Sequence, residues 1–520
     1  MNVVATTVFI FFFLLVTVLG FWASRWKAGD LNSIHQWGLG GRQFGPWVTW
    51  FLIGGDLYTA YTVIAVPALV YGLGAYGFFA VPYTVLIYPL AFLLMPRFWN
   101  VCARRGYVTA GDFVLGRFGS KWLELAVAIT GILATMPYIA LQLVGMEKVI
   151  QALGFHGEGL MSHIPLTVAF LILALYTYSA GLRAPAVIAF VKDIMIYVFV
   201  IVAVIYIPYQ LGGFGAIFDS AGKVYDGMVA AGAAATPPKI VNVGLTLKQA
   251  QIWPFITLAF GSALALFIYP HSLTGVLAAN GPKAIRFNMM ALPLYSLVLG
   301  LIALLGLMGR AAGIEIKAPQ TAQDIVPLLF LKYFPDWFVG FGFAAIAIAA
   351  LVPAAMMSIG AANTFTRNIW RPFVNQHMTD HQEARMAKLI SLLVKVGALL
   401  IILSVQTQFA LDFQTLGGVI MLQIFPALCF GLFTRKVHGQ PLLIGWMVGT
   451  LLSVVLIWIS KNPTTGAFVP ILPASYLGVG IYIGTITVAV NALVSYGFSV
   501  AMPNRGKDET NAADYLDAKI

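Results

Sequence analysis

Long apolar stretches recur along the whole chain, and they constrain its fold more than any other feature. Of the 520 residues, 60% are hydrophobic and 9% are charged, whereas soluble domains average about 25% charged residues. A helix crosses a bilayer with about 20 residues, and the chain contains about 13 stretches of this kind. The sequence therefore predicts an all-α membrane protein with one transmembrane domain, 1–502, and a polar cytoplasmic tail, 503–520. The stretches lie near residues 3–24, 44–73, 75–102, 121–152, 163–182, 185–209, 251–276, 285–311, 336–366, 387–406, 409–433, 438–459 and 475–499.

The basic residues are arranged as in a membrane protein with a fixed orientation. The net charge is +11, but most of the Lys and Arg residues fall in alternate loops, such as those around Arg42, Arg104, Arg371 and Arg435. This alternation follows the positive-inside rule, which places basic loops in the cytoplasm. The pattern predicts an outside N-terminus and a cytoplasmic C-terminus. We therefore expect the basic residues to orient the protein in the lipid bilayer and not to bind nucleic acid.

Sequence patterns typical of enzymes are missing from the chain. No HExxH, GxSxG or P-loop sequence occurs, so a protease, a hydrolase and an ATP-driven pump all lack support. The two cysteines, Cys102 and Cys429, lie at or within apolar stretches and do not suggest a disulfide framework or a metal site. We therefore expect no enzyme activity and no cofactor, and the sequence implies no protein partner.

Two apolar stretches are interrupted near their middles. The second contains Gly55 and Asp56, and the seventh, five stretches later, contains Pro270. The two breaks thus occupy matching places in two successive units of opposite direction, near residues 44–209 and 251–433. Breaks at matching places are typical of inverted-repeat transporters, whose sites lie at the breaks. The alternative is that these Gly and Pro residues serve only packing or kinks.

The carboxyl group of Asp56 needs a reason to lie inside an apolar stretch. An acidic side chain at the centre of a membrane helix costs about 2.5–3.5 kcal/mol even on insertion-based scales. Three roles remain open: Asp56 accepts hydrogen bonds from unwound backbone, pairs with Lys192 of the sixth stretch, or carries a proton itself.

Several motifs resemble those of one transporter family. They lie at residues 39–46, 106–113, 181–184, 349–370 and 431–433. Through these motifs most of the chain is similar to the solute:sodium symporter family, and residues 55–62 and 137–145 look closest to its branch for short monocarboxylates. The resemblance implies a five-plus-five inverted-repeat symporter of about 13 spans in the bacterial inner membrane, with the second to eleventh spans as its core.

The resemblance also implies a cation site, and there the chain departs from the family. The site would take backbone carbonyls near Gly55 and Tyr58 and, from the ninth stretch, a carbonyl at Ala349 and two neighbouring side-chain hydroxyls. The positions of those hydroxyls correspond to Val352 and Pro353. At least two side-chain oxygen ligands for Na⁺ are therefore absent.

A lysine of the sixth stretch offers a replacement for the sodium ion. Many family members carry an intramembrane aspartate where this chain has Ala189, and Lys192 follows one turn later on the same helix face. Buried lysines lose their proton readily, so Lys192, with Asp193 beside it, could titrate or stand in for the cation. We therefore predict coupling to H⁺, with Na⁺ as the alternative. Lys192 could instead extend to the cytoplasmic surface.

Candidate substrate-binding residues follow from the breaks and from the resemblance. The N-terminal end of a helix at a break favours an anion, and Thr59, Tyr61 and Thr62 come directly after the first break. Gln142 matches the carboxylate branch, although a single Gln in a membrane helix often only joins helices. Gln414 resembles a substrate contact of the family's sugar carriers.

Three further candidates, Trp253, Tyr269 and His271, lie in the seventh stretch. Aromatic side chains at helical spacing usually face lipid or core. His271 beside Pro270 could simply satisfy a freed carbonyl.

These observations favour a secondary symporter that imports small monocarboxylates such as lactate, pyruvate, acetate or propionate. The alternative is a sodium-coupled carrier of another small solute, such as an amino acid or a sugar. Asp56 and Lys192, the few charged groups near the breaks, suit a small anion better than a polyol. A membrane sensor built on a transporter fold would carry a long signalling domain, and the chain ends shortly after its last stretch.

Overall fold

The computed structural model describes residues 2–26, 29–155, 164–235, 239–404, 410–504 and 506–517, without the side chains of 402–404. The predicted span boundaries at 163, 406 and 409 and the tail residues 505 and 518–520 lie outside the described residues. The first half of the chain forms α1 (Val3–Trp22), α2 (Ile34–Leu39), α3 (Pro46–Gly55), α4 (Val66–Leu73), α5 (Ala80–Arg105), α6 (Ala110–Phe118), α7 (Lys121–Ala152), α8 (Ile164–Ala180), α9 (Arg183–Gln210) and α10 (Phe214–Ala234). The second half forms α11 (Gln249–Leu266), α12 (Pro270–Ala278), α13 (Pro282–Ala291), α14 (Pro293–Ala311), α15 (Ile325–Tyr333), α16 (Asp336–Phe365), α17 (Arg371–Phe373), α18 (Asp380–Ser404), α19 (Leu411–Met421), α20 (Phe425–Phe433), α21 (Gly439–Ile459), α22 (Ala474–Leu477) and α23 (Ile483–Ala501).

Ten helical runs of the described residues are long and apolar enough to cross a membrane. Each stretch predicted from the sequence falls on one helix or on a consecutive pair, such as α3 with α4 or α11 with α12. Two short strands, β1 (Ile471–Leu472) and β2 (Ile481–Tyr482), pair in antiparallel fashion between α21 and α23. The prediction of an all-α, multi-pass membrane protein is confirmed. The total of about 13 spans stays a prediction.

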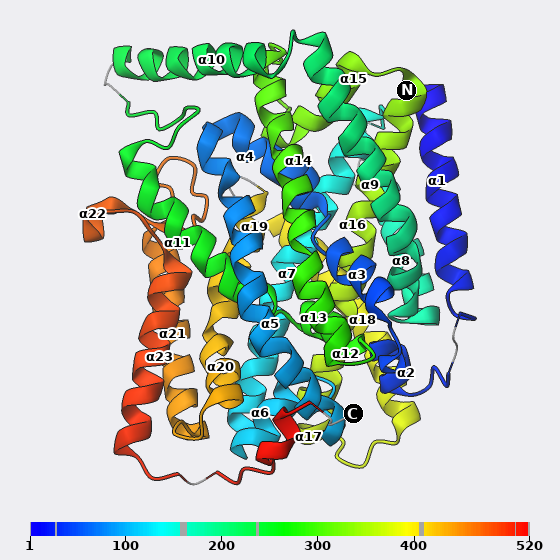
Figure 1. The fold of residues 1–520 in the computed structure, drawn as a ribbon, viewed down its shortest axis with the longest axis vertical. Helices are drawn as coiled ribbons and strands as arrows, with labels where there is room; N and C mark the ends of the chain where they lie inside the picture. Colours follow the sequence, from blue (N-terminus) through cyan, green and yellow to red (C-terminus); the bar gives the residue numbers. More distant parts are fainter. Residues whose placement is uncertain are drawn as a thin grey trace.

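The long helix α16 lies inside the bundle (Figure 1) and packs against α1, α7, α9, α12 and α18. Its sequence is rich in Ala and Gly, and nearly all of its residues are buried. At Gly340 the contact with α1 is so close that a Cβ atom would lie 2.3 Å from the backbone oxygen of Ala5. Small residues allow this approach, as in other membrane helix interfaces.

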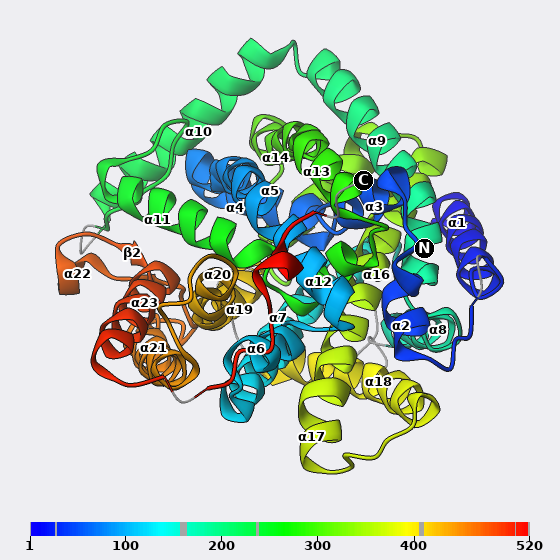
Figure 2. The same ribbon diagram turned by 60° about the horizontal axis from the view of Figure 1, so that its bottom comes forward.

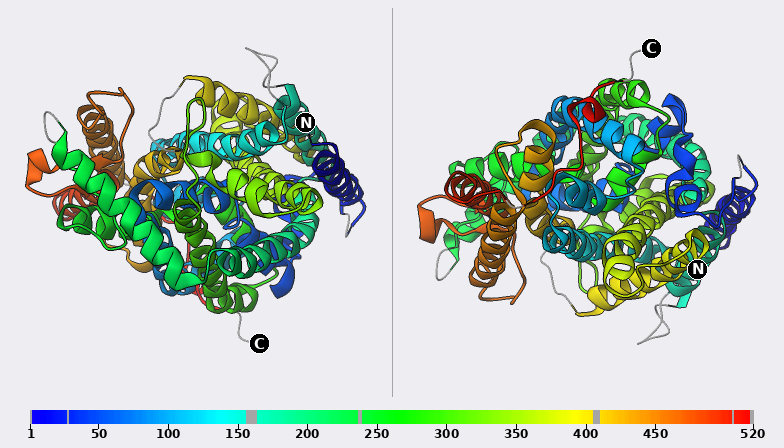
Figure 3. Two further views of the ribbon diagram at one scale, coloured as in Figure 1. Left: turned by 90° about the horizontal axis from the view of Figure 1, so that it is seen from above. Right: turned by 90° about the horizontal axis from the view of Figure 1, so that it is seen from below.

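The two termini lie at opposite ends of the bundle, which we call the N face and the C face (Figure 1). α10 lies across the N face (Figure 3), between the apolar stretches predicted at 185–209 and 251–276. The described residues that follow it, 239–248, contain no helix or strand. The short helix α15 lies between the stretches predicted at 285–311 and 336–366, and it buries Ile325, Leu329 and Phe330 against the bundle.

The C-terminal segment 506–517, which is part of the polar tail predicted from the sequence, lies along the C face (Figure 2). Acidic side chains of the segment meet arginines on helices that are far apart in sequence. This charge complementarity is invisible in the local composition of the tail, which is merely polar. The ion pairs join Asp508 to Arg117, Asp514 to Arg105 and Asp517 to Arg286, with N–O distances of 2.8, 2.6 and 2.7 Å.

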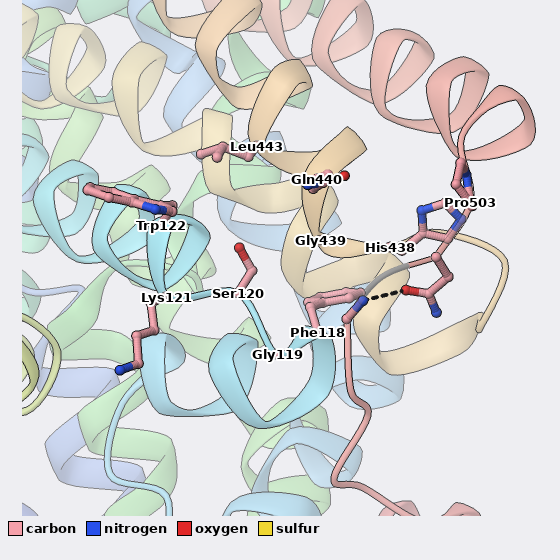
Figure 4. Close-up of a pocket in the computed structure, with 12 residues that line it drawn as sticks. Phe118, Gly119, Ser120, Lys121, Trp122, His438, Gly439, Gln440, Leu443 and Pro503 are labelled. Carbon is pink, nitrogen blue, oxygen red and sulfur yellow. Dashed lines mark hydrogen bonds between the residues drawn. The ribbon is translucent and has the colours of Figure 1, made fainter.

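The start of the tail also forms one wall of a cavity of about 430 Å³ at the C face. The cavity lies between the beginnings of α7 and α21, and Pro503 stands close to His438 at its edge (Figure 4). Its lining contains no residue of either helix break. The cavity therefore belongs to the attachment of the tail and not to the breaks.

Candidate transport site

The first break separates α3 from the π-helical turn η2 (Tyr61–Ala65), which continues into α4. Two glycines at the end of α3 let neighbouring helices approach it. A Cβ atom on Gly54 would lie 2.4 Å from the ring of Tyr295 in α14, and one on Gly55 would lie 2.9 Å from Nζ of Lys192 in α9. The glycine pair therefore brings two polar side chains against the unwound backbone.

Three polar side chains hold the backbone of the break in shape. The Oγ1 atom of Thr62 accepts a hydrogen bond from the amide of Thr59 at 2.9 Å and donates to its carbonyl at 2.9 Å. The Thr59 hydroxyl accepts from the amide of Tyr61 at 2.9 Å. Gln142 of α7 accepts from the amide of Ala60 at 3.1 Å. These bonds satisfy amides that would otherwise be unpaired in a buried place.

Lys192 lies at the carbonyl groups of the first break. Its ammonium group donates to the backbone oxygens of Gly55 and Tyr58, the second at 3.2 Å. It also forms an ion pair with Asp193 at 3.3 Å, and both side chains are fully buried. Lys192 therefore does not extend to the surface, and it pairs with its neighbour although adjacent side chains on a helix point about 100° apart.

An aromatic group encloses the Lys192–Asp193 pair. The hydroxyl of Tyr295 donates to Asp193 at 2.7 Å, and the ring of Tyr295 lies 4.4 Å from that of Tyr58. Sequence reasoning did not identify Tyr295, because its partner lies on another helix and its own stretch shows no unusual polar pattern.

The second break separates α11 from α12, and Pro270 starts α12. His271 and Ser272, in the first turn of α12, face Asp56: His271 Nε2 lies 3.3 Å from Asp56 Oδ2, and the Ser272 hydroxyl donates to the same oxygen at 3.4 Å. A helix N-terminus stabilises a carboxylate. The structure thus pairs Asp56 with the opposite break, whereas Lys192 pairs with Asp193.

Several buried polar atoms around the two breaks have no hydrogen-bond partner within the described part of the chain. They include Asp56 Oδ1, Tyr61 Oη, Gln414 Oε1 and Nδ1 of His271. Such atoms each cost about 1–3 kcal/mol unless a ligand or water satisfies them. Tyr269 lies beside these atoms: its hydroxyl donates to the backbone carbonyl of Gln414 at 3.4 Å, and its ring lies 5.4 Å from that of His271.

Trp253 lies apart from these residues. Half of its surface, 51%, is exposed, as expected for an aromatic side chain on the outside of α11. The structure therefore gives Trp253 no place beside the breaks.

The residues expected at the sodium position supply no side-chain oxygen. Ala349 and Val352 are fully buried in α16, and Pro353 follows them. α16 packs against both α9 and α12, so this side of the site is apolar. Na⁺ needs several oxygen ligands, and the carbonyls of Gly55 and Tyr58 already bind Lys192.

Comparison with known proteins places this architecture among transporters. The family model described as the sodium:solute symporter family matches residues 37–449. A monocarboxylate transport permease protein of Rhizobium johnstonii is 58% identical over 458 residues, which cover 88% of this chain and 89% of that protein. The uncharacterized symporter YodF of Bacillus subtilis is 32% identical over 457 residues, or 88% of each chain.

A solved structure shows the same fold. It is the substrate-bound, outward-open state of a Na⁺-coupled sialic acid symporter, with a TM-score of 0.73 over 97% of this chain and 99% of that one. At 14% identity, the likeness concerns the fold alone. It confirms the fold predicted from the resemblance.

Proposed function

Because this chain belongs to the sodium:solute symporter family, and is thus a multi-pass symporter and not an enzyme, we propose that it imports short monocarboxylates together with protons. The substrate class is supported by the permease of Rhizobium johnstonii and by the resemblance of the first break to the carboxylate branch. The proposed location is the bacterial inner membrane. The N face lies outside and the C face in the cytoplasm, because the basic loops gather at the C face.

The observation that carries the coupling proposal is the position of Lys192. Its ammonium group lies at the carbonyls of Gly55 and Tyr58, to which the family resemblance assigns the cation. A sodium ion about 4 Å from this ammonium would be repelled by about 4 kcal/mol at an effective dielectric constant of 20. We propose that Lys192 replaces the sodium ion as a fixed cation.

The charges of the site then favour a proton as the mobile ion. Asp56 and Asp193 bring two negative charges and Lys192 brings one positive charge. Binding a monocarboxylate would add a second net negative charge to a buried site, which is unfavourable unless a proton arrives with it. We propose that Asp56, together with His271, receives this proton.

Donors for the substrate carboxylate are the unpartnered groups between the breaks. Tyr61 offers its hydroxyl and His271 offers Nδ1, both without a partner within the described residues, and the NH2 group of Gln414 is the third donor that we propose. Thr59, Thr62 and Gln142 shape the break and orient its amides. Trp253 is left out of this proposal because of its exposure.

The test is uptake of labelled lactate into proteoliposomes under an inward proton gradient or an inward sodium gradient. We expect proton-driven accumulation that does not depend on sodium. Lys192→Gln is expected to abolish it, because the fixed cation is lost. Asp56→Asn resembles the protonated form, so it should still exchange internal for external lactate but should not accumulate lactate along a pH gradient.

The matched control is Lys395→Gln. Lys395 is a second buried lysine, in α18, whose ammonium donates to Ser391 of its own helix at 3.2 and 3.0 Å. Loss of this lysine should leave the choice of ion unchanged. Full pH-driven uptake by Lys192→Gln would contradict the role of Lys192.

Sodium coupling is the second candidate, and the family as a whole favours it. It requires Lys192 to leave the carbonyls of Gly55 and Tyr58 when Na⁺ binds. Strict sodium dependence of wild-type uptake would select this candidate and would reject the fixed-cation proposal.

A further inference from the structure

An ion pair lines a cavity on the N face. Lys148, near the end of α7, places its Nζ 2.9 Å from Oδ2 of Asp324 in the short turn η5 (Ala322–Asp324). The cavity measures about 580 Å³, within the range of about 300–1,000 Å³ that is usual for small-molecule sites. The two side chains keep 14% and 12% of their surface exposed, so the pair can be reached from the N face.

The same ion pair joins two elements above the first break. η5 and α15 both contact η2, the turn that carries Tyr61 and Thr62, and α7 contacts η2 and η5. The Lys148–Asp324 pair therefore ties the segment formed by η5 and α15 to the helix that also carries Gln142.

The two partners of the pair are not equally dependent on each other. Asp324 also accepts hydrogen bonds from the amide and the hydroxyl of Thr321, at 2.7 and 3.2 Å. Lys148 donates to Asp324 alone within the described residues. If another carboxylate bound the ammonium group of Lys148, Asp324 would keep its two hydrogen bonds from Thr321.

We propose that Lys148 is the first residue to bind the carboxylate of the substrate, which takes the place of Asp324. This inference rests on the proposed function, since it requires a carboxylate substrate and an outside N face. The ammonium of Lys148 keeps one carboxylate partner throughout the exchange, and Asp324 keeps its two hydrogen bonds from Thr321. The exchange also releases η5 and α15 from α7 above the first break.

The test measures the KM of lactate uptake in three variants, with lactate supplied on the N face. Lys148→Gln should raise KM, by less than the roughly tenfold effect of losing one hydrogen bond between charged groups, because in the wild type the substrate has to displace Asp324. Lys148→Arg should stay near the wild type. Asp324→Asn should lower KM, because the internal competitor for Lys148 is gone.

The opposite shifts distinguish binding from a structural role. If the pair merely holds the fold, Lys148→Gln and Asp324→Asn break the same contact and change uptake in the same direction, which would overturn the inference. An unchanged KM in Lys148→Gln would also overturn it. The control is Lys317→Gln, since Lys317 is 79% exposed and pairs with Glu315 near the same segment.

A chemical rescue separates misfolding from lost recognition. Lys148→Cys is treated with 2-aminoethyl methanethiosulfonate, which restores an ammonium group at that position, and KM should return toward the wild-type value. The native cysteines interfere little, because Cys102 is buried and Cys429 is partly so. No recovery in a folded protein would count against Lys148. If the wild type takes up no lactate, the proposed function is wrong; if the wild type is active and these variants match it, only this inference is wrong.

Discussion

Removing the charge of Asp193 should destabilise the protein far more than removing the charges of both Asp193 and Lys192. The two side chains form an ion pair at 3.3 Å with no exposed surface, so Asp193→Asn leaves a buried ammonium without its carboxylate. Breaking a buried pair in this way costs about 3–5 kcal/mol. The double variant Lys192→Gln/Asp193→Asn carries no charge there, and it should recover most of that loss.

Tyr295→Phe provides a second measure of how much the contacts of the Asp193 carboxylate contribute to stability. It removes a hydrogen bond of 2.7 Å to Asp193, and a bond to a charged group contributes about 1.5–3 kcal/mol. Because Tyr295 and Lys192 share one partner, we expect their effects to be non-additive by about 0.5–3 kcal/mol.

The assay is unfolding of the purified protein in mixed micelles with increasing SDS, followed by the fluorescence of its 12 tryptophans. Tyr58→Phe serves as a control, since the hydroxyl of Tyr58 bonds to the Tyr295 carbonyl, at 3.5 Å, and to the side chain of Tyr197, and not to Asp193, within the described residues. If Asp193→Asn is as stable as the wild type, Lys192 is not held as a charged partner of Asp193. Lys192 would then not act as a fixed cation.

Two further outcomes can be checked with the same material. Gln142→Ala should lower stability by about 1–3 kcal/mol and reduce uptake, because the amide of Ala60 loses its acceptor. Wild-type uptake by Gln142→Ala would deny Gln142 its role in the break. The hydrogen bonds that Arg286 and Asn100 donate hold the pKa of Asp517 below 3.8. The ionised Asp517 therefore stabilises the attached tail at pH values above 3.8. This stabilisation is lost only as the pH falls through the lower pKa that Asp517 has in the folded state. Protease digestion of the tail should therefore be equally slow from neutral pH down to about 3.8, and release at mildly acidic pH would contradict the ion pairs described for the C face.

The sequence predicted those parts of the site that depend on one helix or on the family register. Glycines and a carboxylate that interrupt an apolar stretch predict the break at Asp56. The family register predicts the place of Lys192, which lies one helix turn after Ala189. Its contact with Gly55 and Tyr58 agrees with that register. These features need no knowledge of how distant helices meet.

Other parts depend on how the two repeats are placed against each other. Asp56 faces His271 and Ser272 of the opposite break, and no local sequence pattern predicts this contact. Trp253 shows the converse, since an aromatic residue near a break in sequence lies on the outer surface. The attachment of the tail likewise depends on ion pairs with arginines of α5, α6 and α13, which are distant in sequence.

The attachment of Lys192 to the chain has a consequence for how the carbonyls of the first break are occupied. A free ion binds them in proportion to its concentration in the medium, whereas a tethered ammonium has an effective concentration set by chain geometry. The carbonyls of Gly55 and Tyr58 are therefore filled to the same extent whether the surrounding water is fresh or saline. The conformation of the first break in such a carrier therefore does not depend on the sodium concentration of the medium.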